Sequence, residues 1–392
     1  MKKFIIFLSI CIFSYFNVSP IVVCAASNSK DNIDAEIGSN IADQLNNLDL
    51  SGLDSYLNDL NFNLYNQTSF SDLVASITKG DYFLDFNGIV NFVLNFLFGN
   101  VKSVIPFLFL IIAIAVLGSI VNNLKSDKLS GGVSDLVHFL CYAVIILILA
   151  GIVTNIISTS NNVLSSMLNQ MQIIFPIMLT MLTSVGAVVS VGIYKPIVSI
   201  LSQVIGFVFA KFLFPLFVLS FLFLIVGNLS KNIKLNKFND LFASVFKWSV
   251  GFIFTMFSAF LTIQGISAGK FDGISIKATK FAVKSYIPLV GGYLSDGFDL
   301  IMCASVLIKN AVGVAGLLIM FTTIIKPIVY ILTVKFGLQL VSAILEPIGD
   351  GRISNFTSSA SKILIYPVVI ILSVAFMYVL SAGLIMTTAN VF

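Results

Sequence analysis

The feature that most constrains this chain is a series of long apolar runs that begins at Val104 and continues to the C-terminal region. About 20 apolar residues are enough for a helix to cross the hydrocarbon core of a bilayer. Helices are expected because backbone groups in lipid must satisfy one another. Hydrophobic residues make up 58% of the chain and charged residues only 10%, which excludes an ordinary soluble domain. The sequence therefore predicts an all-α polytopic membrane protein.

The apolar runs predict about eight transmembrane helices, and seven to ten remain compatible with the pattern. The expected spans are residues 104–122, 136–157, 173–193, 197–227, 249–268, 287–308, 311–339 and 363–389. The runs around Lys211 and Lys326 are too long for one straight crossing. A tilt, a kink at Pro215 or Pro327, and a re-entrant segment all stay open.

The N-terminus, residues 1–26, has the pattern of a secretory signal peptide. Two lysines precede an apolar core from Phe4 to Phe16, and small residues at Ala25 and Ala26 suit cleavage. An uncleaved anchor and a lipid-modified Cys24 are the alternatives. The segment that follows is therefore expected outside the cytoplasm.

Charge is strongly segregated along the chain. Residues 27–101 carry ten Asp or Glu against two Lys, whereas the part from Lys102 onward carries eighteen Lys or Arg against eight Asp or Glu. Apolar residues in the acidic segment recur every three to five positions, which predicts short amphipathic helices that need a partner or a membrane surface. The expected domains are thus a signal, an acidic extracytoplasmic segment (27–101) and a multi-span membrane domain (102–392).

Lys and Arg in short loops give the expected orientation. With the acidic segment outside, the eight spans place nine basic residues in cytoplasmic loops and five outside. The basic loop in 228–247 is the exception, because this arrangement places it outside. A hairpin in the preceding run or an acidic partner would explain it. The side occupied by the loop in 269–286 is open in the same way.

Two weakly similar units, about 160–270 and 272–382, are suggested by an offset of 112 residues. Pro176 and Pro215 are 39 positions apart, and so are Pro288 and Pro327. Two units of three spans would have opposite orientations in the membrane, as in the inverted repeats of transporters. Chance agreement of two prolines is the alternative.

One polar cluster lies within the membrane domain, at Asp296, Asp299, Lys309 and Asn310. Ionisable groups at membrane depth must face water, a counter-charge or the interface. The cluster is therefore either the lining of a polar path or an interfacial turn, and the glycines of "VGGYLSDGFD" favour the turn.

A second group, Lys277, Lys280 and Lys284, has helical spacing and suits anionic lipid at the inner leaflet of the membrane. No catalytic, cofactor-binding or metal-binding residues are predicted. His138 is the single histidine, and no Walker loop, zinc-protease motif or dinucleotide fingerprint occurs. The chain is accordingly not expected to be an enzyme or to carry a cofactor, and no nucleic-acid partner is expected.

The segment "GISIKATKFAVKSYIPLVGGYLSDGFDLIMCASVLIKNAVG", followed by "LEPIGDGR", resembles the stage III sporulation protein AE family of endospore-forming Firmicutes. The resemblance covers essentially the whole chain and is densest from Lys270 to Gly351. It implies a non-enzymatic membrane component of the channel-like complex that links mother cell and forespore and that supports late forespore gene expression.

Further expectations follow from this resemblance. Partners would be products of the same operon, including ring-forming subunits and an ATPase, and indirectly a forespore membrane protein. The location would be the mother-cell (outer forespore) membrane, with the acidic segment in the intermembrane space. The family has no catalytic residues to transfer. A stand-alone secondary transporter or permease for a small solute is the alternative function.

Overall fold

The computed structural model describes residues 69–79, 86–123, 131–229, 236–286, 291–348 and 351–388. The expected signal peptide and most of the acidic segment lie outside these residues. Within them the chain is helical and has no strand. The helices are α4 (Phe70–Lys79), α5 (Phe86–Asn123), α6 (Gly131–Ser184), α7 (Val188–Val208), the π-helix η2 (Phe209–Leu213), α8 (Phe214–Leu229), α9 (Asn236–Tyr286), α10 (Gly291–Leu345), α11 (Gly351–Ile363) and α12 (Ile365–Thr387).

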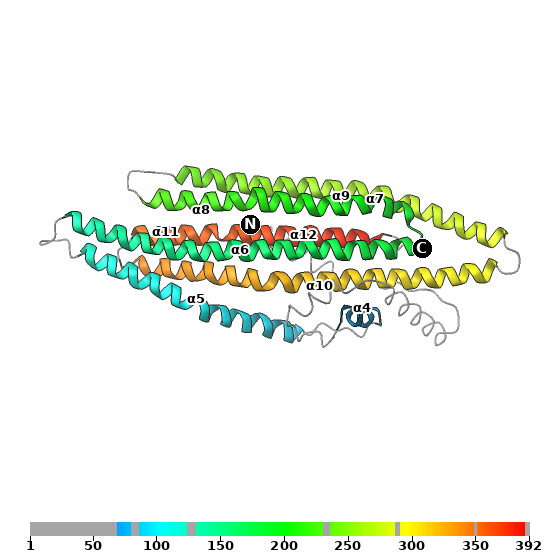
Figure 1. Ribbon diagram of the computed structural model, residues 1–392, viewed down its shortest axis with the longest axis horizontal. Helices are drawn as coiled ribbons and strands as arrows, with labels where there is room; N and C mark the ends of the chain where they lie inside the picture. The colour runs from blue at the N-terminus through cyan, green and yellow to red at the C-terminus, as the bar shows by residue number, and fades with distance from the viewer. Residues whose placement is uncertain are drawn as a thin grey trace.

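The long helices lie along one axis and form an elongated bundle, while the short α4 packs against α10 (Figure 1). Successive long helices run in opposite directions. The continuous run α7–η2–α8 counts as one of them, and so does α11 followed by α12. α5 crosses the bundle obliquely and contacts α6 and α10.

Six helical stretches in the described part of the chain are long and apolar enough to cross a membrane, rather than the eight spans expected. Residues 136–157 and 173–193 had been expected as two spans, but α6 runs unbroken through the first of them and on to Ser184. The expected spans 287–308 and 311–339 likewise share α10. The expected breaks fall at "STSNNVLSSMLNQMQ" and at Lys309-Asn310. These positions are polar but hold no Pro or Gly, so nothing local ends the helix.

The long helices exceed the thickness of one bilayer. α6 has 54 residues, which at 1.5 Å per residue makes it about 81 Å long. The hydrocarbon core is about 30 Å thick, and transmembrane helices tilt by about 20° on average. A tilt of this size therefore cannot fit the whole helix within the hydrocarbon core, and α6 extends well beyond it.

The ends of the helices correct the expected grouping of basic loops. The helix ends that border residues 124–130, 230–235 and 349–350 lie together at one end of the bundle (Figure 1). Lys125 and Lys128 are therefore joined to the same end as the basic segment around Lys231 and Lys234. Because α6 is one helix instead of two spans, the parity changes if each long helix crosses the membrane once. The basic loop in 228–247 then lies on the side of Lys125 and Lys128, whereas Lys277, Lys280 and Lys284 at the end of α9 move to the opposite side.

The direction of the helices also bears on the proposed 112-residue units. The run α7–η2–α8 and α10, which this offset aligns, point the same way along the bundle (Figure 1). A relation between the two units would then be parallel and not inverted. The units themselves stay a prediction.

The centre of the bundle is formed by α10 and α12. In the apolar window of α12, which includes α11, 72% of residues are buried inside the protein, against 61% for α10 and 17% for α9. Fully buried aromatic side chains fill the core, among them Phe175 and Tyr378, whose rings pack 5.3 Å apart. α9 therefore presents most of its surface outward.

The π-helix has a local cause. Pro215 lacks a backbone N–H and would clash with the carbonyl of the residue four positions earlier in a regular helix. The five residues of η2 end two positions before this proline, and the N–H of Phe214 bonds the carbonyl of Phe209. The widened turn lets the helix continue past Pro215 with Lys211 exposed on it.

Candidate functional site

Lys309 lies on α10 and has no exposed surface. Its ammonium group donates a hydrogen bond to the backbone carbonyl of Thr388, the residue that ends α12. The last carbonyls of a helix have no partner within the helix and carry the negative end of its dipole. A buried cation is therefore held against the end of the most buried helix.

The hydroxyl group of Thr388 extends this contact to α7. It donates to the carbonyl of Leu384 at 2.8 Å, so its only hydrogen is engaged. The hydroxyl of Tyr194 lies 3.3 Å from the Thr388 hydroxyl oxygen and must be the donor in that bond. Tyr194 is itself only 2% exposed. The end of α12 is thus joined to α7 as well as to α10.

Asp272 on α9 caps the beginning of α7. One carboxylate oxygen accepts the N–H groups of Val189 at 3.1 Å and Ser190 at 3.3 Å, and the other accepts that of Ser190 at 3.2 Å. The N-cap position of α7 is Ala187, whose side chain offers no oxygen. A carboxylate from another helix therefore fills the role that Ser or Asp usually fills from within the helix.

The turn between α6 and α7 brings these N–H groups into place. Gly186 has a φ of 87°, a conformation that favours glycine. Its N–H bonds Thr183 at 2.8 Å, and that of Ala187 bonds Leu182 at 3.2 Å. This pair of bonds is a Schellman motif, which ends α6 and lets α7 start within three residues.

Together these contacts make one network that joins four helices at one end of the bundle, where α6 ends and the chain's C-terminus lies (Figure 1). We call Asp272, Tyr194, Thr388 and Lys309 the end network. It holds one anion at a helix start and one cation at a helix end, which are the favourable positions for each charge. In the described part of the chain, no three His, Cys, Asp or Glu side chains gather as a metal ion would require.

Further polar groups lie along the contact of α10 with α6 and α12. The amide nitrogen of Gln170 donates to Thr323, and that of Asn155 to Tyr330, each at 3.0 Å. Among the buried side-chain atoms that have no hydrogen-bond partner in the described part of the chain are Gln170 Oε1, Asn310 Oδ1 and the Tyr378 hydroxyl. Buried polar atoms are usually hydrogen-bonded to protein groups or to water, because leaving them without a partner is costly. We call Gln170, Thr323, Asn155, Tyr330, Asn310 and Tyr378 the polar seam.

The residues predicted as a polar cluster follow one another along a single helix, as their spacing in the sequence requires. Asp296, Asp299, Lys309 and Asn310 all lie on α10, but ten residues of helix put Lys309 about 15 Å from Asp299 along the axis. Asp299 is half-buried, and the side chain of Asp296 is not among those that the structure describes. The residues do not form one compact site, and their role as a path or as an interfacial turn stays a prediction.

The predicted basic stripe lies on a helix, as its spacing requires. Lys277, Lys280 and Lys284 all belong to α9, and Lys277 is exposed. Whether they bind anionic lipid stays a prediction.

Sequence reasoning missed three members of the end network. Asp272 carried a signal, because it is the only acidic residue between Asp240 and Asp296 and lies among four lysines. Tyr194 and Thr388 carried none, because a tyrosine and a threonine in apolar runs are ordinary.

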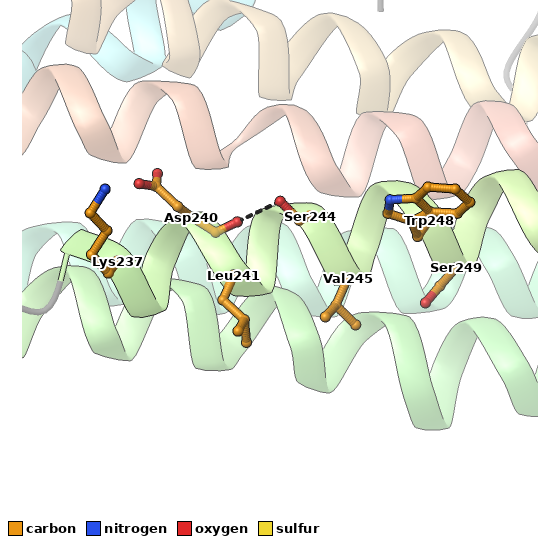
Figure 2. A pocket seen from close by; sticks show the side chains of 7 residues that line it. All are labelled: Lys237, Asp240, Leu241, Ser244, Val245, Trp248 and Ser249. Atoms are coloured by element: carbon orange, nitrogen blue, oxygen red, sulfur yellow. Dashed lines mark hydrogen bonds between the residues drawn. The ribbon is translucent and has the colours of Figure 1, made fainter.

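A shallow groove also lies along the first turns of α9, at the opposite end of the bundle from the end network. It is lined by Lys237, Asp240, Leu241, Ser244, Val245, Trp248 and Ser249 (Figure 2). All of these belong to one helix, and Trp248 is 81% exposed. An exposed Trp beside Lys and Asp is typical of the membrane interface, so the groove indicates position and not a buried ligand site.

Comparison with known proteins supplies a family. A family profile described as Stage III sporulation protein AE matches residues 68–389. A curated relative, "Stage III sporulation protein AE" of Bacillus subtilis (strain 168), is 28% identical over 234 residues, which are 60% of this chain and 59% of the relative. The aligned part is therefore less than two thirds of the relative's length. No solved structure matches the chain.

Proposed function

The chain belongs to the stage III sporulation protein AE family, and on that premise we propose that it is an integral membrane component of the channel-like complex linking mother cell and forespore. The match over residues 68–389 carries this proposal, because it includes all six apolar stretches of the membrane bundle. A role in sporulation and a multi-pass membrane location follow from the family and the fold. The complex, its partners and the non-enzymatic role belong to the proposal.

The charge distribution supports a division of labour within the chain. The acidic segment, 27–101, would lie in the intermembrane space and meet domains of partner proteins. These would be the ring-forming subunits and the ATPase encoded by the same operon, with a forespore membrane protein contacted indirectly. The membrane bundle would sit in the mother-cell (outer forespore) membrane, without catalytic residues of its own.

The test is genetic. Deleting the gene in a spore former should abolish late forespore transcription and heat-resistant spores, and the intact gene supplied in the mother cell should restore both. Supplying it only in the forespore should not. Normal late forespore transcription in the deletion strain would contradict the proposal.

The orientation can be measured with single cysteines. The helix ends that border residues 124–130 and 230–235 lie at one end of the bundle, and Ser275 belongs to the last turns of α9. A membrane-impermeant thiol reagent should therefore label Ser126→Cys and Asn232→Cys from the same side, and Ser275→Cys from the other. Opposite labelling of the first two would contradict the parity given by a continuous α6.

A stand-alone transporter or permease for a small solute is the second candidate, and the polar seam favours it. Gln170, Asn310 and Tyr378 keep polar atoms without hydrogen-bond partners in the described part of the chain, and a polar solute could pair with such atoms. Purified protein reconstituted alone in vesicles should move no solute if the first proposal holds. Solute movement without partner proteins would favour the transporter.

The predicted path at Asp296, Asp299, Lys309 and Asn310 would be part of either function. Asp299→Asn should then block spore formation while the protein still accumulates in the membrane. Normal sporulation of this variant would leave the interfacial turn as the better interpretation.

A further inference from the structure

One face of α6 is exposed from Leu136 onward and changes character halfway along the helix. Its first turns expose apolar side chains, of which Leu136, Leu140 and Leu147 are 63%, 60% and 71% exposed. Later turns continue the same spacing of three and four with exposed, uncharged polar side chains. These are Asn162, Ser165, Asn169 and Gln172, and we call them the α6 polar stripe.

The level of the stripe along the bundle is fixed by a close contact with α7. A Cβ added to Gly206 would lie 2.8 Å from Leu168 Cδ1, so Gly206 sits beside the middle of the stripe. At this level α7 exposes Val204 and Phe207, which are 51% and 68% exposed. Large apolar side chains on the outside of a membrane protein suit lipid, so this level of the bundle belongs in hydrocarbon.

Exposed faces of the neighbouring helices α6 and α7 therefore meet different surroundings at one depth. Lipid tails can cover Val204 and Phe207, but they cannot hydrogen-bond the amides of Asn162, Asn169 and Gln172. α6 already uses its other faces against α5, α7, α10 and α12. The stripe thus needs a partner that lies in the membrane and supplies both donors and acceptors.

We propose that this partner is a second copy of the same chain, packed so that α6 of one copy faces α6 of the other. A side-chain amide both donates and accepts, so a row of amides complements itself across a twofold axis. The stripe holds no charge that would call for an oppositely charged partner. Ser165 is small enough for close approach of the two helices, and Asn and Gln form interhelical hydrogen bonds in membranes. The proposal does not depend on the channel-like complex.

Oxidative cross-linking of the full-length protein in its native membranes tests the contact. Ser165→Cys and Asn169→Cys should each give a band at twice the chain's mass of 42.6 kDa, several times stronger than in the parent with its native cysteines. Val204→Cys and Phe207→Cys are matched controls, because they are exposed at the same depth on the α7 side. They should stay at the parent's background.

A second variant separates the contact from chance collision. Asn169→Leu added to Ser165→Cys should lower the dimer fraction about threefold for each interhelical bond lost, whereas Asn169→Gln should keep it. Equal cross-linking on both faces, no dimer at either stripe position, or a cross-linked band of another mass would overturn the proposal. Each readout is a band on a gel from membranes, so it can be read whether or not spores form.

Discussion

Replacing Asp272 with alanine should lower the free energy of unfolding by about 2–4 kcal/mol, because the buried N–H group of Ser190 and the part-buried N–H group of Val189 would lose their acceptor. Asp272 is 2% exposed and accepts from Val189 and Ser190 at 3.1–3.3 Å. Each buried donor left unpaired costs about 1–3 kcal/mol. Two such donors would cost about 2–6 kcal/mol in total. Removing the carboxylate also removes the cost of burying its charge, so the expected loss of stability lies in the lower half of that range.

A serine at the N-cap of α7 should recover part of the stability that Asp272→Ala loses. Ala187 is the N-cap of α7 and has no side-chain acceptor. Ala187→Ser in the Asp272→Ala background should restore about 1 kcal/mol, the usual value of an N-cap hydroxyl. Asp272→Asn keeps one acceptor oxygen but loses the charge, so its loss should fall between parent and alanine variant.

The assay is denaturant unfolding of the purified protein in detergent, followed by the helical circular dichroism signal. Asp240→Ala is the matched control, because Asp240 is an exposed carboxylate on the same helix. Its effect should stay within about 0.5 kcal/mol of zero, as for most surface substitutions. An unfolding midpoint of Asp272→Ala equal to that of the parent would refute the reasoning, and so would Ala187→Ser without any recovery.

Four further outcomes follow from the packing and can be read in the same unfolding assay or by proteolysis. Lys309→Met should cost about 1.5–3 kcal/mol, because it removes a charged donor from the buried end of α12, whereas exposed Lys211→Met should change little. Gly316→Ala should destabilise by about 1–3 kcal/mol, because its Cβ would lie 2.7 Å from Ile174 Cδ1. Gly151→Ala should instead stabilise by about 0.5–1 kcal/mol, because nothing lies within 4 Å of that position. Leu73→Ala should loosen α4 from α10, at a cost of about 2–5 kcal/mol, and should speed protease cleavage before α5.

The sequence by itself determined the class of the molecule and its family. Long apolar runs admit only helices in lipid, and the segment from Lys270 to Gly351 carried a resemblance that the family profile confirmed. It did not determine the number of helices. A polar stretch such as that in the middle of α6 can mark a loop or the exposed face of a continuous helix, and local sequence does not distinguish the two.

Only the tertiary structure decided which polar residues meet. Lys309 and Asp299 share a helix and a sequence neighbourhood, yet ten residues of helix separate them by about 15 Å. Lys309 instead meets Thr388, which is 79 positions away, and Asp272 meets Ser190, which is 82 positions away. Such pairs arise because unpaired groups at helix ends must find partners on whichever helix packs beside them. The packing order of the helices sets that choice, and no local pattern encodes it.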